Sequence, residues 1–269
     1  MQPNERTALL EQVRLLARRA GQAIMPFYRQ GLVPTAKPDS SPLTSADLAS
    51  HSLIAAALPA FLPGLPVISE ESEPALRDSL AGAERFWLVD PLDGTKEFLK
   101  GAGEFTVNIA LVENGRCTLG VVDAPALDAS YCAAAGLGAW RRRGIAAPEP
   151  IAARPAPPAA QLALVASKDH AGPRVQALLA KLPGATLRSM GSSLKFCLVA
   201  EGSADLYLRD LPTMEWDTAA AQCVVETAGG QICSLDGERL LYGKPGLKNP
   251  PIMTVGDPSL DWKQLAAVA

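Results

Sequence analysis

Two aspartates stand three positions apart in the stretch WLVDPLDGTK, as residues 90 and 93. An apolar strand is expected to deliver Asp90 at its end, and Pro91 then prevents the strand from continuing as a ladder. Asp93 is followed by Gly94 and Thr95, which open a turn or helix. Both carboxylates can converge on one point beside exposed backbone amides, so this stretch could bind a cation and a phosphate together. An aspartate-capped surface turn is the alternative interpretation.

Other acidic residues occupy positions from which they could join this pair. Glu70 and Glu71 follow the apolar stretch PVIS, so at least one further carboxylate lies at the end of a strand. Asp47 in SPLTSAD and Asp217 in EWDTAAAQ each begin a predicted helix, where a plain N-cap is the alternative role. These hard oxygen donors have no His or Cys cluster nearby. The sequence therefore favours Mg²⁺ or Mn²⁺ over zinc.

The first half of the chain predicts helices packed on a largely antiparallel sheet. Apolar residues recur at helical spacing from 9 to 24, until Pro26 ends or bends the pattern. A second helix is expected to start between Thr44 and Ala46. Glu113-Asn114-Gly115 is a strong hairpin signal between two of the predicted strands. Strands are expected at 65–69, 85–90, 104–112, 116–123 and 129–135.

A domain boundary is predicted where prolines cluster between Gly144 and Ala160, because this composition resists both helix and strand. Afterwards strand-like and helix-like segments alternate, which indicates an α/β arrangement. Strands are expected at 162–167, 186–191, 204–210 and 251–255, and helices at 173–181, at 192–202 and from Asp217. The predicted domains are an α+β domain over 1–147, with most of the acidic residues, and a smaller α/β domain over 148–269, with Asp217.

Composition limits the classes of protein that fit. The 269 residues are 48% hydrophobic, and the formal net charge is only −3 with dispersed basic residues, so a binder of nucleic-acid polymers is excluded. Five cysteines without a CxxC pair indicate a reducing compartment. No signal peptide or apolar run of about 18 residues is present. We expect a soluble cytoplasmic protein without a transmembrane segment; peripheral association with the inner membrane and the oligomeric state stay open.

Three stretches together resemble the metal-site motifs of the inositol monophosphatase-like, Mg²⁺-dependent, lithium-sensitive phosphatases. They are SEE at 69–71, WLVDPLDGTKEF at 87–98 and WDTAAAQCVVETAGG at 216–230. Within that superfamily, SSPLTSAD at 40–47, GEFTVNIALVENG at 103–115 and GSSLKFCLVAEG at 191–202 are most similar to the bacterial 3′(2′),5′-bisphosphate nucleotidase branch. The resemblance extends from about Lys37 to Gly230. It implies an α+β fold, the layered αβαβα sandwich of the inositol monophosphatase/fructose-1,6-bisphosphatase type.

The resemblance also implies a set of metal ligands. One Mg²⁺ would be held by Glu70, Asp90 and the backbone carbonyl of Leu92, and a second by Asp90, Asp93 and Asp217, so that Asp90 bridges the two. A third, looser ion would involve Glu70 and water. Two ions of this kind neutralise charge on the attacking and leaving oxygens of a phosphate ester.

Three further residues receive roles from the same resemblance. Asp47 and Thr95 would form a dyad in which the threonine hydroxyl donates to the carboxylate and orients the attacking, metal-activated water. Glu71 would support the site from behind its ligands. With Glu70 as the third catalytic residue, the implied reaction is direct in-line hydrolysis without a phosphoenzyme.

Residues that choose the substrate form a separate prediction. In bisphosphate nucleotidases, a histidine, a Ser-x-x-Lys and an arginine contact the second phosphate or the sugar. The matching residues are His170 in ASKDH, Ser192, Lys195 and Arg209. A surface histidine, a solvated helix lysine and a strand-end arginine are their alternative interpretations. The scissile phosphate would contact Glu70, Leu92, Asp93, Gly94, Thr95 and Asp217.

The preferred function is hydrolysis of the 3′-phosphate of 3′-phosphoadenosine 5′-phosphate to AMP and phosphate, and also of its 5′-phosphosulfate relative, as a recycling step in sulfate assimilation. Its partner would be a small phosphorylated nucleotide. An inositol or sugar monophosphatase with the same metal site is the alternative. A non-catalytic sensor of a phosphorylated metabolite is a third hypothesis, and it would require a broken catalytic set.

Overall fold

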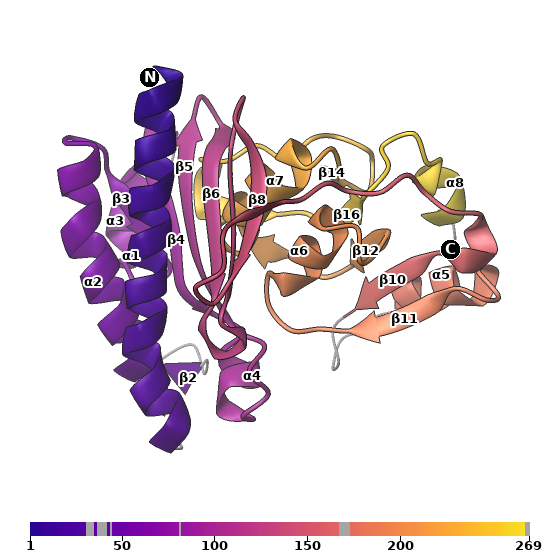
Figure 1. Cartoon of the computed structure of the whole chain (residues 1–269), viewed down its shortest axis with the longest axis horizontal. Helices are drawn as coiled ribbons and strands as arrows, with labels where there is room; N and C mark the ends of the chain where they lie inside the picture. The colour runs from indigo at the N-terminus through magenta and orange to yellow at the C-terminus, as the bar shows by residue number, and fades with distance from the viewer. Residues whose placement is uncertain (31–34, 37–41, 44, 81, 167–172, 267–269) are drawn as a thin grey trace.

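The computed structural model describes the chain except residues 31–34, 37–41, 44, 81, 167–172 and 267–269. Figure 1 shows its elements stacked in layers, in the order helices, large sheet, helices, smaller sheet, helices. The outer helices on one side are α1 (Pro3–Gln30) and α2 (Ser45–Phe61), and the central pair is α6 (Leu194–Ala200) and α7 (Ala219–Thr227). On the far side lie α5 (Pro173–Lys181) and α8 (Trp262–Ala266). The predicted αβαβα sandwich is therefore confirmed.

The large sheet has the strand order β3-β4-β5-β6-β7-β8-β9. β3 and β4 are parallel and the other neighbours are antiparallel, as the alternation of strands and turns predicts. Asn114 and Gly115, with φ angles of 51° and 72°, form the tight turn between β5 and β6. The strands are β3 (Val67–Ser69), β4 (Arg85–Asp93), β5 (Thr106–Glu113), β6 (Arg116–Ala124), β7 (Ala129–Ala134), β8 (Gly138–Arg143) and β9 (Glu149–Pro150).

The smaller sheet has the order β11-β10-β12-β16-β14. β10 is parallel to both of its neighbours, whereas β16 is antiparallel to both of its own. The strands are β10 (Ala163–Ala166), β11 (Thr186–Ser189), β12 (Leu206–Arg209), β14 (Gln231–Ser234) and β16 (Ile252–Val255). This mixed sheet agrees with the alternating pattern of the second half of the sequence.

Short elements complete the fold. Two small antiparallel pairs join β1 (Thr35–Ala36) to β2 (Pro42–Leu43) and β13 (Thr213–Met214) to β15 (Lys248–Asn249). The short helices are α3 (Pro74–Leu80) and α4 (Thr95–Leu99), and the 3₁₀ turns are η1 (Pro125–Leu127), η2 (Ala159–Gln161), η3 (Glu215–Asp217) and η4 (Pro245–Leu247).

Apolar side chains fill the spaces between the layers in three clusters. The helices α6 and α7 are enclosed between the two sheets, and β6 and α7 approach so closely that position 120 must be glycine. A Cβ atom at Gly120 would lie 2.3 Å from the Ala220 carbonyl oxygen. Each fully buried large side chain of such a core stabilises the fold by about 1.5–3 kcal/mol. The packing therefore fixes α7 against the strand that faces it.

Three local predictions need correction. The N-terminal helix continues through Pro26 to Gln30, because its α2 and sheet contacts hold the turn that proline disfavours. Asp217 does not begin the long helix: it lies in η3, and α7 starts at Ala219. β4 extends past Pro91, but its register with β5 shifts between Asp90 and Asp93. The ladder is thus interrupted at the proline, as expected, and then resumes.

The proposed division into domains at residue 147 follows the two sheets only approximately. β9 still pairs with β8 in the large sheet at Glu149 and Pro150. α7 belongs to the second half of the sequence yet packs on β6 of the first sheet. We retain 1–147 and 148–269 as a proposal for the two folding units, with α7 lying between the sheets (Figure 1).

Candidate active site

The end of β4 carries the first acidic pair, and its shape follows from Pro91. Asp90 is buried, and its Oδ1 accepts a hydrogen bond from the Leu92 amide at 3.0 Å. The Ser50 hydroxyl of α2 donates to the Pro91 carbonyl at 2.8 Å, which ties the bulge to the outer helix. Because the ladder is interrupted here, residues 90–93 turn away from the regular strand path. The bulge thereby directs the two aspartates to the same region.

Gly94 follows with a φ of 92°, in the left-handed region that favours glycine. A Cβ atom at this position would lie 3.1 Å from the Glu104 carbonyl and 3.2 Å from the Ser192 Cβ. The next residue, Thr95, begins α4, and its hydroxyl donates to the Leu92 carbonyl at 3.4 Å. This turn therefore lies directly against the start of the Ser192 segment.

Asp93 connects the first half of the chain to the turn before α6. Its Oδ2 accepts hydrogen bonds from the Ser193 amide at 2.6 Å and the Ser193 hydroxyl at 2.7 Å. A longer bond of 3.4 Å comes from the Thr106 hydroxyl on β5. The sequence prediction named Ser192 and missed Ser193, although the two serines are adjacent. The pattern Ser-Ser-Leu-Lys does not say which hydroxyl faces the carboxylates.

The Ser193 hydroxyl also lies near a second acidic segment. It is 2.8 Å from the backbone carbonyl of Asp217, and it accepts a hydrogen bond from the Asn108 side-chain amide at 3.0 Å. Since a hydroxyl carries one proton, it can donate to Asp93 or to Asp217 at any moment, but not to both. The side chain of Asp217 is held by the Met214 amide, which donates to Oδ2 at 2.8 Å.

The carboxylates of the site influence each other electrostatically. Burial raises the pKa of the Asp90 carboxyl well above its usual value, and neighbouring carboxylates raise this pKa further. In decreasing order of effect these neighbours are Glu70, Asp93, Asp217 and Asp47. Burial also raises the pKa of Asp217, followed by the charge of Asp93, against a lowering effect of the Met214 amide. The structure thus brings together all five acidic residues that were predicted to cooperate.

This donor set suits a hard divalent cation. Carboxylate and carbonyl oxygens are the ligands that Mg²⁺ prefers, and the mutual repulsion expressed in these raised pKa values is what a bound cation would relieve. The carbonyl of Leu92 accepts a long hydrogen bond of 3.4 Å from Thr95 and projects within the same bulge. No three Asp, Glu, His or Cys side chains among the described residues already meet as ligands around one point.

Glu70 and Glu71 lie at the end of β3. The Glu70 amide donates to the Val89 carbonyl at 3.1 Å, which extends the parallel pairing of β3 with β4 toward Asp90. The Ser69 hydroxyl accepts from the Glu71 amide at 3.3 Å and lies 3.0 Å from the His51 Nδ1. Burial lowers the pKa of His51, and the Glu71 charge opposes that shift. His51 was not predicted; its position one helical turn after the acidic residue of α2 was the available signal.

Two of the predicted substrate residues are cations near the carboxylates. Lys195 is buried, with its Nζ 2.7 Å from the Ser192 carbonyl oxygen and 5.4 Å from the centre of the Tyr207 ring. Burial lowers the Lys195 pKa to about 8, against the attraction of Asp93, and Arg209 lowers it further. The solvated-lysine alternative is therefore wrong. Arg209 ends β12 and its charge acts on Asp217. His170 lies outside the described residues.

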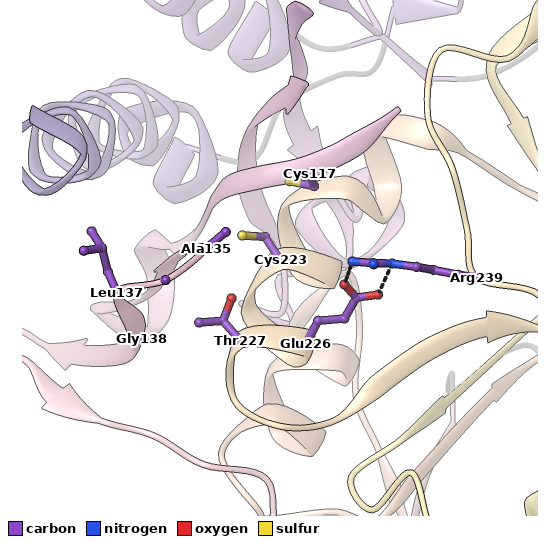
Figure 2. Close-up of a pocket in the computed structure, with 9 residues that line it drawn as sticks. Cys117, Ala135, Leu137, Gly138, Cys223, Glu226, Thr227 and Arg239 are labelled. Atoms are coloured by element: carbon purple, nitrogen blue, oxygen red, sulfur yellow. Dashed lines mark hydrogen bonds and ion pairs between the residues drawn. The ribbon is translucent and has the colours of Figure 1, made fainter. Parts of the chain in front are cut away.

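A separate cavity of about 510 Å³ lies at the opposite end of α7 from Asp217 (Figure 2). Its lining includes Cys117 and Cys223, together with Glu226, whose carboxylate is ion-paired with Arg239. None of the predicted site residues lines this cavity. All five cysteines are free thiols, and no helix among the described residues has the length and apolar character needed to cross a membrane.

Comparison with known proteins identifies the class to which this fold and site belong. The family model described as the inositol monophosphatase family matches residues 5–263. The structure of CysQ from Bacteroides thetaiotaomicron, a bacterial member of that family, has a TM-score of 0.78 at 36% identity, covering 94% of this chain and 98% of that one. An inositol monophosphatase from Anabaena has a TM-score of 0.73 at 25% identity, covering 99% of this chain and 96% of that one.

The chain therefore belongs to the inositol monophosphatase family, as its motifs predicted. Relatives named 3′(2′),5′-bisphosphate nucleotidase CysQ are similar over most of its length. The one from Salmonella typhimurium is 47% identical over 238 residues, which is 87% of this chain and 94% of the relative. The one from Escherichia coli K12 is 46% identical over the same shares.

Proposed function

We propose that the chain is a Mg²⁺-dependent 3′(2′),5′-bisphosphate nucleotidase that removes the 3′-phosphate of 3′-phosphoadenosine 5′-phosphate, giving AMP and phosphate. The observation that carries this proposal is the pair of cations, Lys195 and Arg209, beside the carboxylates Asp93 and Asp217. A substrate with a second phosphate needs positive charge next to the hydrolytic centre. The relatives named CysQ support the same substrate class.

The carboxylates and one carbonyl have the chemistry to hold the metal. We assign Glu70, Asp90, Asp93, Asp217 and the Leu92 carbonyl as ligands of two or three Mg²⁺ ions, for which Mn²⁺ could substitute. When bound, the ions supply neutralisation of charge on the phosphate oxygens and a lowered pKa for water. Asp90 is central to this assignment, because the other carboxylates act on its pKa.

The residues of the bulge and of α2 would position the reacting groups. Gly94 leaves the backbone of the turn open to the phosphate, since it carries no side chain where the left-handed conformation brings Glu104 and Ser192 close. Thr95 and Asp47 would form the dyad that orients the attacking water, in which the carboxylate accepts the threonine proton. Attack in line with the leaving 3′-oxygen then releases phosphate directly.

The cationic side would bind the remainder of the nucleotide. Arg209 is a fork-shaped donor at the end of β12 and would pair with the 5′-phosphate. Lys195 contributes charge from beneath the Ser192 turn, because its ammonium group is buried and donates to the Ser192 carbonyl. We assign Ser192 to the substrate and keep His170 as a candidate contact. The 5′-phosphosulfate relative carries similar charge and would fit the same groups.

An inositol or sugar monophosphatase remains a second candidate, favoured by the family model and by the fold of the Anabaena protein. The cations Lys195 and Arg209 distinguish the two candidates, because a monophosphate has no second anionic group for them. The non-catalytic hypothesis required a broken catalytic set. The acidic residues that it would lack are present and adjacent, so we do not propose it.

Product analysis tests the proposal. The purified chain, incubated with 3′-phosphoadenosine 5′-phosphate and Mg²⁺, is expected to release phosphate and 5′-AMP, and chelation of the metal is expected to abolish the release. Release of 3′-AMP would show attack at the other phosphate. Absence of hydrolysis with Mg²⁺ or Mn²⁺ would contradict the proposed activity. We further propose a cytoplasmic location, where the nucleotide is recycled after sulfate transfer.

A further inference from the structure

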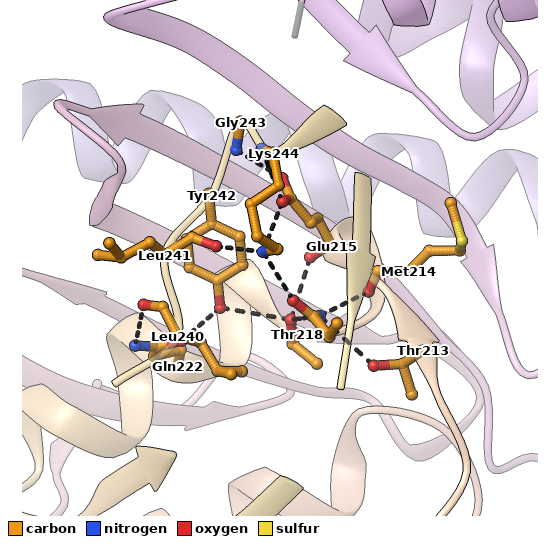
Figure 3. Close-up of polar contacts among 11 residues, drawn as sticks. Thr213, Met214, Glu215, Thr218, Gln222, Leu240, Leu241, Tyr242, Gly243 and Lys244 are labelled. Atoms are coloured by element: carbon orange, nitrogen blue, oxygen red, sulfur yellow. Dashed lines mark hydrogen bonds and ion pairs between the residues drawn. The ribbon is translucent and has the colours of Figure 1, made fainter. Parts of the chain in front are cut away.

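Asp217 lies in a turn that is held from behind by a later segment of the chain. We call residues 242–249 the back clamp; it follows β14 and includes η4 and β15. Figure 3 shows its side chains gathered around the residues that flank Asp217. β13 pairs with β15 through Thr213 and Met214, immediately before η3. The back clamp therefore contacts the very turn that presents the Asp217 carboxylate.

The strongest contact of the back clamp is with Glu215, two residues before Asp217. Glu215 is fully buried, and its carboxylate accepts hydrogen bonds from the Gly243 amide at 2.7 Å and the Lys244 amide at 3.0 Å. The Lys244 ammonium group lies 2.6 Å from Glu215 Oε1 (Figure 3). A buried carboxylate is stable only when paired and hydrogen-bonded, and these three donors satisfy it.

The other flank of Asp217 is held by polar side chains. The Asn249 side-chain amide donates to the Thr218 hydroxyl at 2.8 Å and to the Met214 carbonyl at 3.1 Å. The Thr218 hydroxyl in turn donates to the Glu215 carbonyl at 3.2 Å. Residues on both sides of Asp217 are therefore fixed to the same clamp. Asp217 itself, whose Oδ2 accepts from the Met214 amide, has its place set by this turn.

From these contacts we infer that Glu215 and Lys244 are positioning residues for the metal site: their buried ion pair fixes η3 so that Asp217 faces Asp90 and Asp93. The inference rests on the proposed function, because it takes Asp217 as a Mg²⁺ ligand. Neither residue touches substrate or the reacting atoms. Groups that orient a metal ligand from behind typically change metal affinity or activity by about 10- to 100-fold when they are removed.

The chain offers a matched control on the same helical segment. Arg239 is ion-paired with Glu226 near the C-terminal end of α7 (Figure 2), whereas Lys244 is ion-paired just before its start. The two cations are close in sequence and are exposed to a similar degree, with side-chain exposures of 40% and 35%. Only Lys244 holds the turn around Asp217. Neutralising either residue removes one ion pair from this helical segment, so a general loss of stability would affect both variants.

The test compares Lys244→Met, Lys244→Arg and Arg239→Met with the wild type, without nucleotide present. Mg²⁺ affinity is measured by calorimetric titration and by the rise in melting temperature on adding Mg²⁺. We expect Lys244→Met to bind Mg²⁺ about 10- to 100-fold more weakly, Lys244→Arg to recover most of that loss, and Arg239→Met to match the wild type. Equal Mg²⁺ affinities in Lys244→Met and Arg239→Met would overturn the inference.

A second variant covers the case in which Lys244→Met does not fold. Glu215→Gln keeps the size of the side chain and an acceptor for the clamp amides, and it should also weaken Mg²⁺ binding while its KM at saturating Mg²⁺ stays unchanged. Wild-type Mg²⁺ affinity in this variant would overturn the positioning role. Because the titrations contain no nucleotide, a wrong substrate assignment leaves their result intact. Absence of Mg²⁺ binding in the wild type would overturn both the inference and the proposed metal site.

Discussion

The Ser193 hydroxyl lies 2.7 Å from Asp93 Oδ2, and the Ser193 amide lies 2.6 Å from the same oxygen atom. These residues are 100 positions apart, and the hydroxyl is also 2.8 Å from the Asp217 carbonyl. Two of the proposed ligands, which come from opposite ends of the sequence, thus share one buried serine. The contact fixes the distance between the β4 bulge and η3, which the metal site requires.

Replacement of Ser193 by alanine should therefore weaken the metal site. Asp93 would keep the backbone donor but lose the hydroxyl, and η3 would lose its link to the bulge. We expect Mg²⁺ affinity to fall about tenfold. The neighbouring Ser192→Ala is the control, because Ser192 is assigned to the substrate: it should raise KM and leave Mg²⁺ affinity unchanged. The reverse pattern would show that the two serines have exchanged roles.

Replacement of Asp93 by asparagine should abolish most of the Mg²⁺-dependent activity. A neutral amide is a poor metal ligand, and its NH₂ group would oppose one of the Ser193 donors if it took the place of Oδ2. We expect kcat to fall by at least about 100-fold, with the far-ultraviolet circular dichroism spectrum retained. Phosphate release close to that of the wild type would mean that Asp93 is not a metal ligand.

Replacement of Lys195 by methionine should affect the bisphosphate more than a monophosphate. Methionine fills similar space beside Tyr207 but removes the charge that we assign to the second phosphate. A charged hydrogen bond of this kind contributes about 1.5–3 kcal/mol, so kcat/KM for 3′-phosphoadenosine 5′-phosphate should fall about 10- to 100-fold. The value for inositol 1-phosphate should change much less. Equal losses on both substrates would assign Lys195 to the shared hydrolytic machinery.

Asp123 of β6 should make stability depend on pH away from the site. Its carboxyl is buried beneath Gly21 of α1, and no hydrogen-bond partner for its Oδ2 is present among the described residues. Burial raises the Asp123 pKa to about 7, against the lowering effect of Arg18 and Arg14. The folded chain then binds one proton more than the unfolded chain between about pH 4 and 7.

The sign of this contribution follows directly. Stability falls as pH rises from about 4 to 7, because ionised Asp123 is costly to bury, and the cost at pH 8 is at most about 4 kcal/mol. Asp123→Asn should therefore raise the melting temperature more at pH 8 than at pH 5. A thermal unfolding series of both proteins across this range measures the difference. The same change in melting temperature at both pH values would contradict the raised pKa.

The acidic ligands could be predicted from the sequence because each lies in a short motif with a local structural cause. Pro91 explains the interrupted strand, and Gly94 explains the left-handed turn, without knowledge of any distant contact. The order of strands in the first sheet also follows from local turns such as Asn114-Gly115. Local patterns thus predicted the layers and the chemistry of the site.

Features that depend on packing between distant segments could not be predicted. Ser192 and Ser193 have the same residue type, and only the approach of β4 to α6 selects Ser193 for Asp93. Lys195 resembles a solvated helix lysine until Tyr207 and the Ser192 turn cover it. The back clamp contains no motif, since Lys244 acquires its role only when Glu215 is buried against it. Such roles arise from tertiary contacts between residues that carry no local signal.

The proposed nucleotidase activity is tested most directly by comparing kcat/KM for three substrates under the same Mg²⁺ concentration. These are 3′-phosphoadenosine 5′-phosphate, inositol 1-phosphate and fructose 1,6-bisphosphate. Because Lys195 and Arg209 lie beside the carboxylates, the adenosine bisphosphate should have a kcat/KM at least about 100-fold above that of either competitor, as two charged contacts would provide. A higher kcat/KM for inositol 1-phosphate or for the sugar bisphosphate would contradict the proposed function.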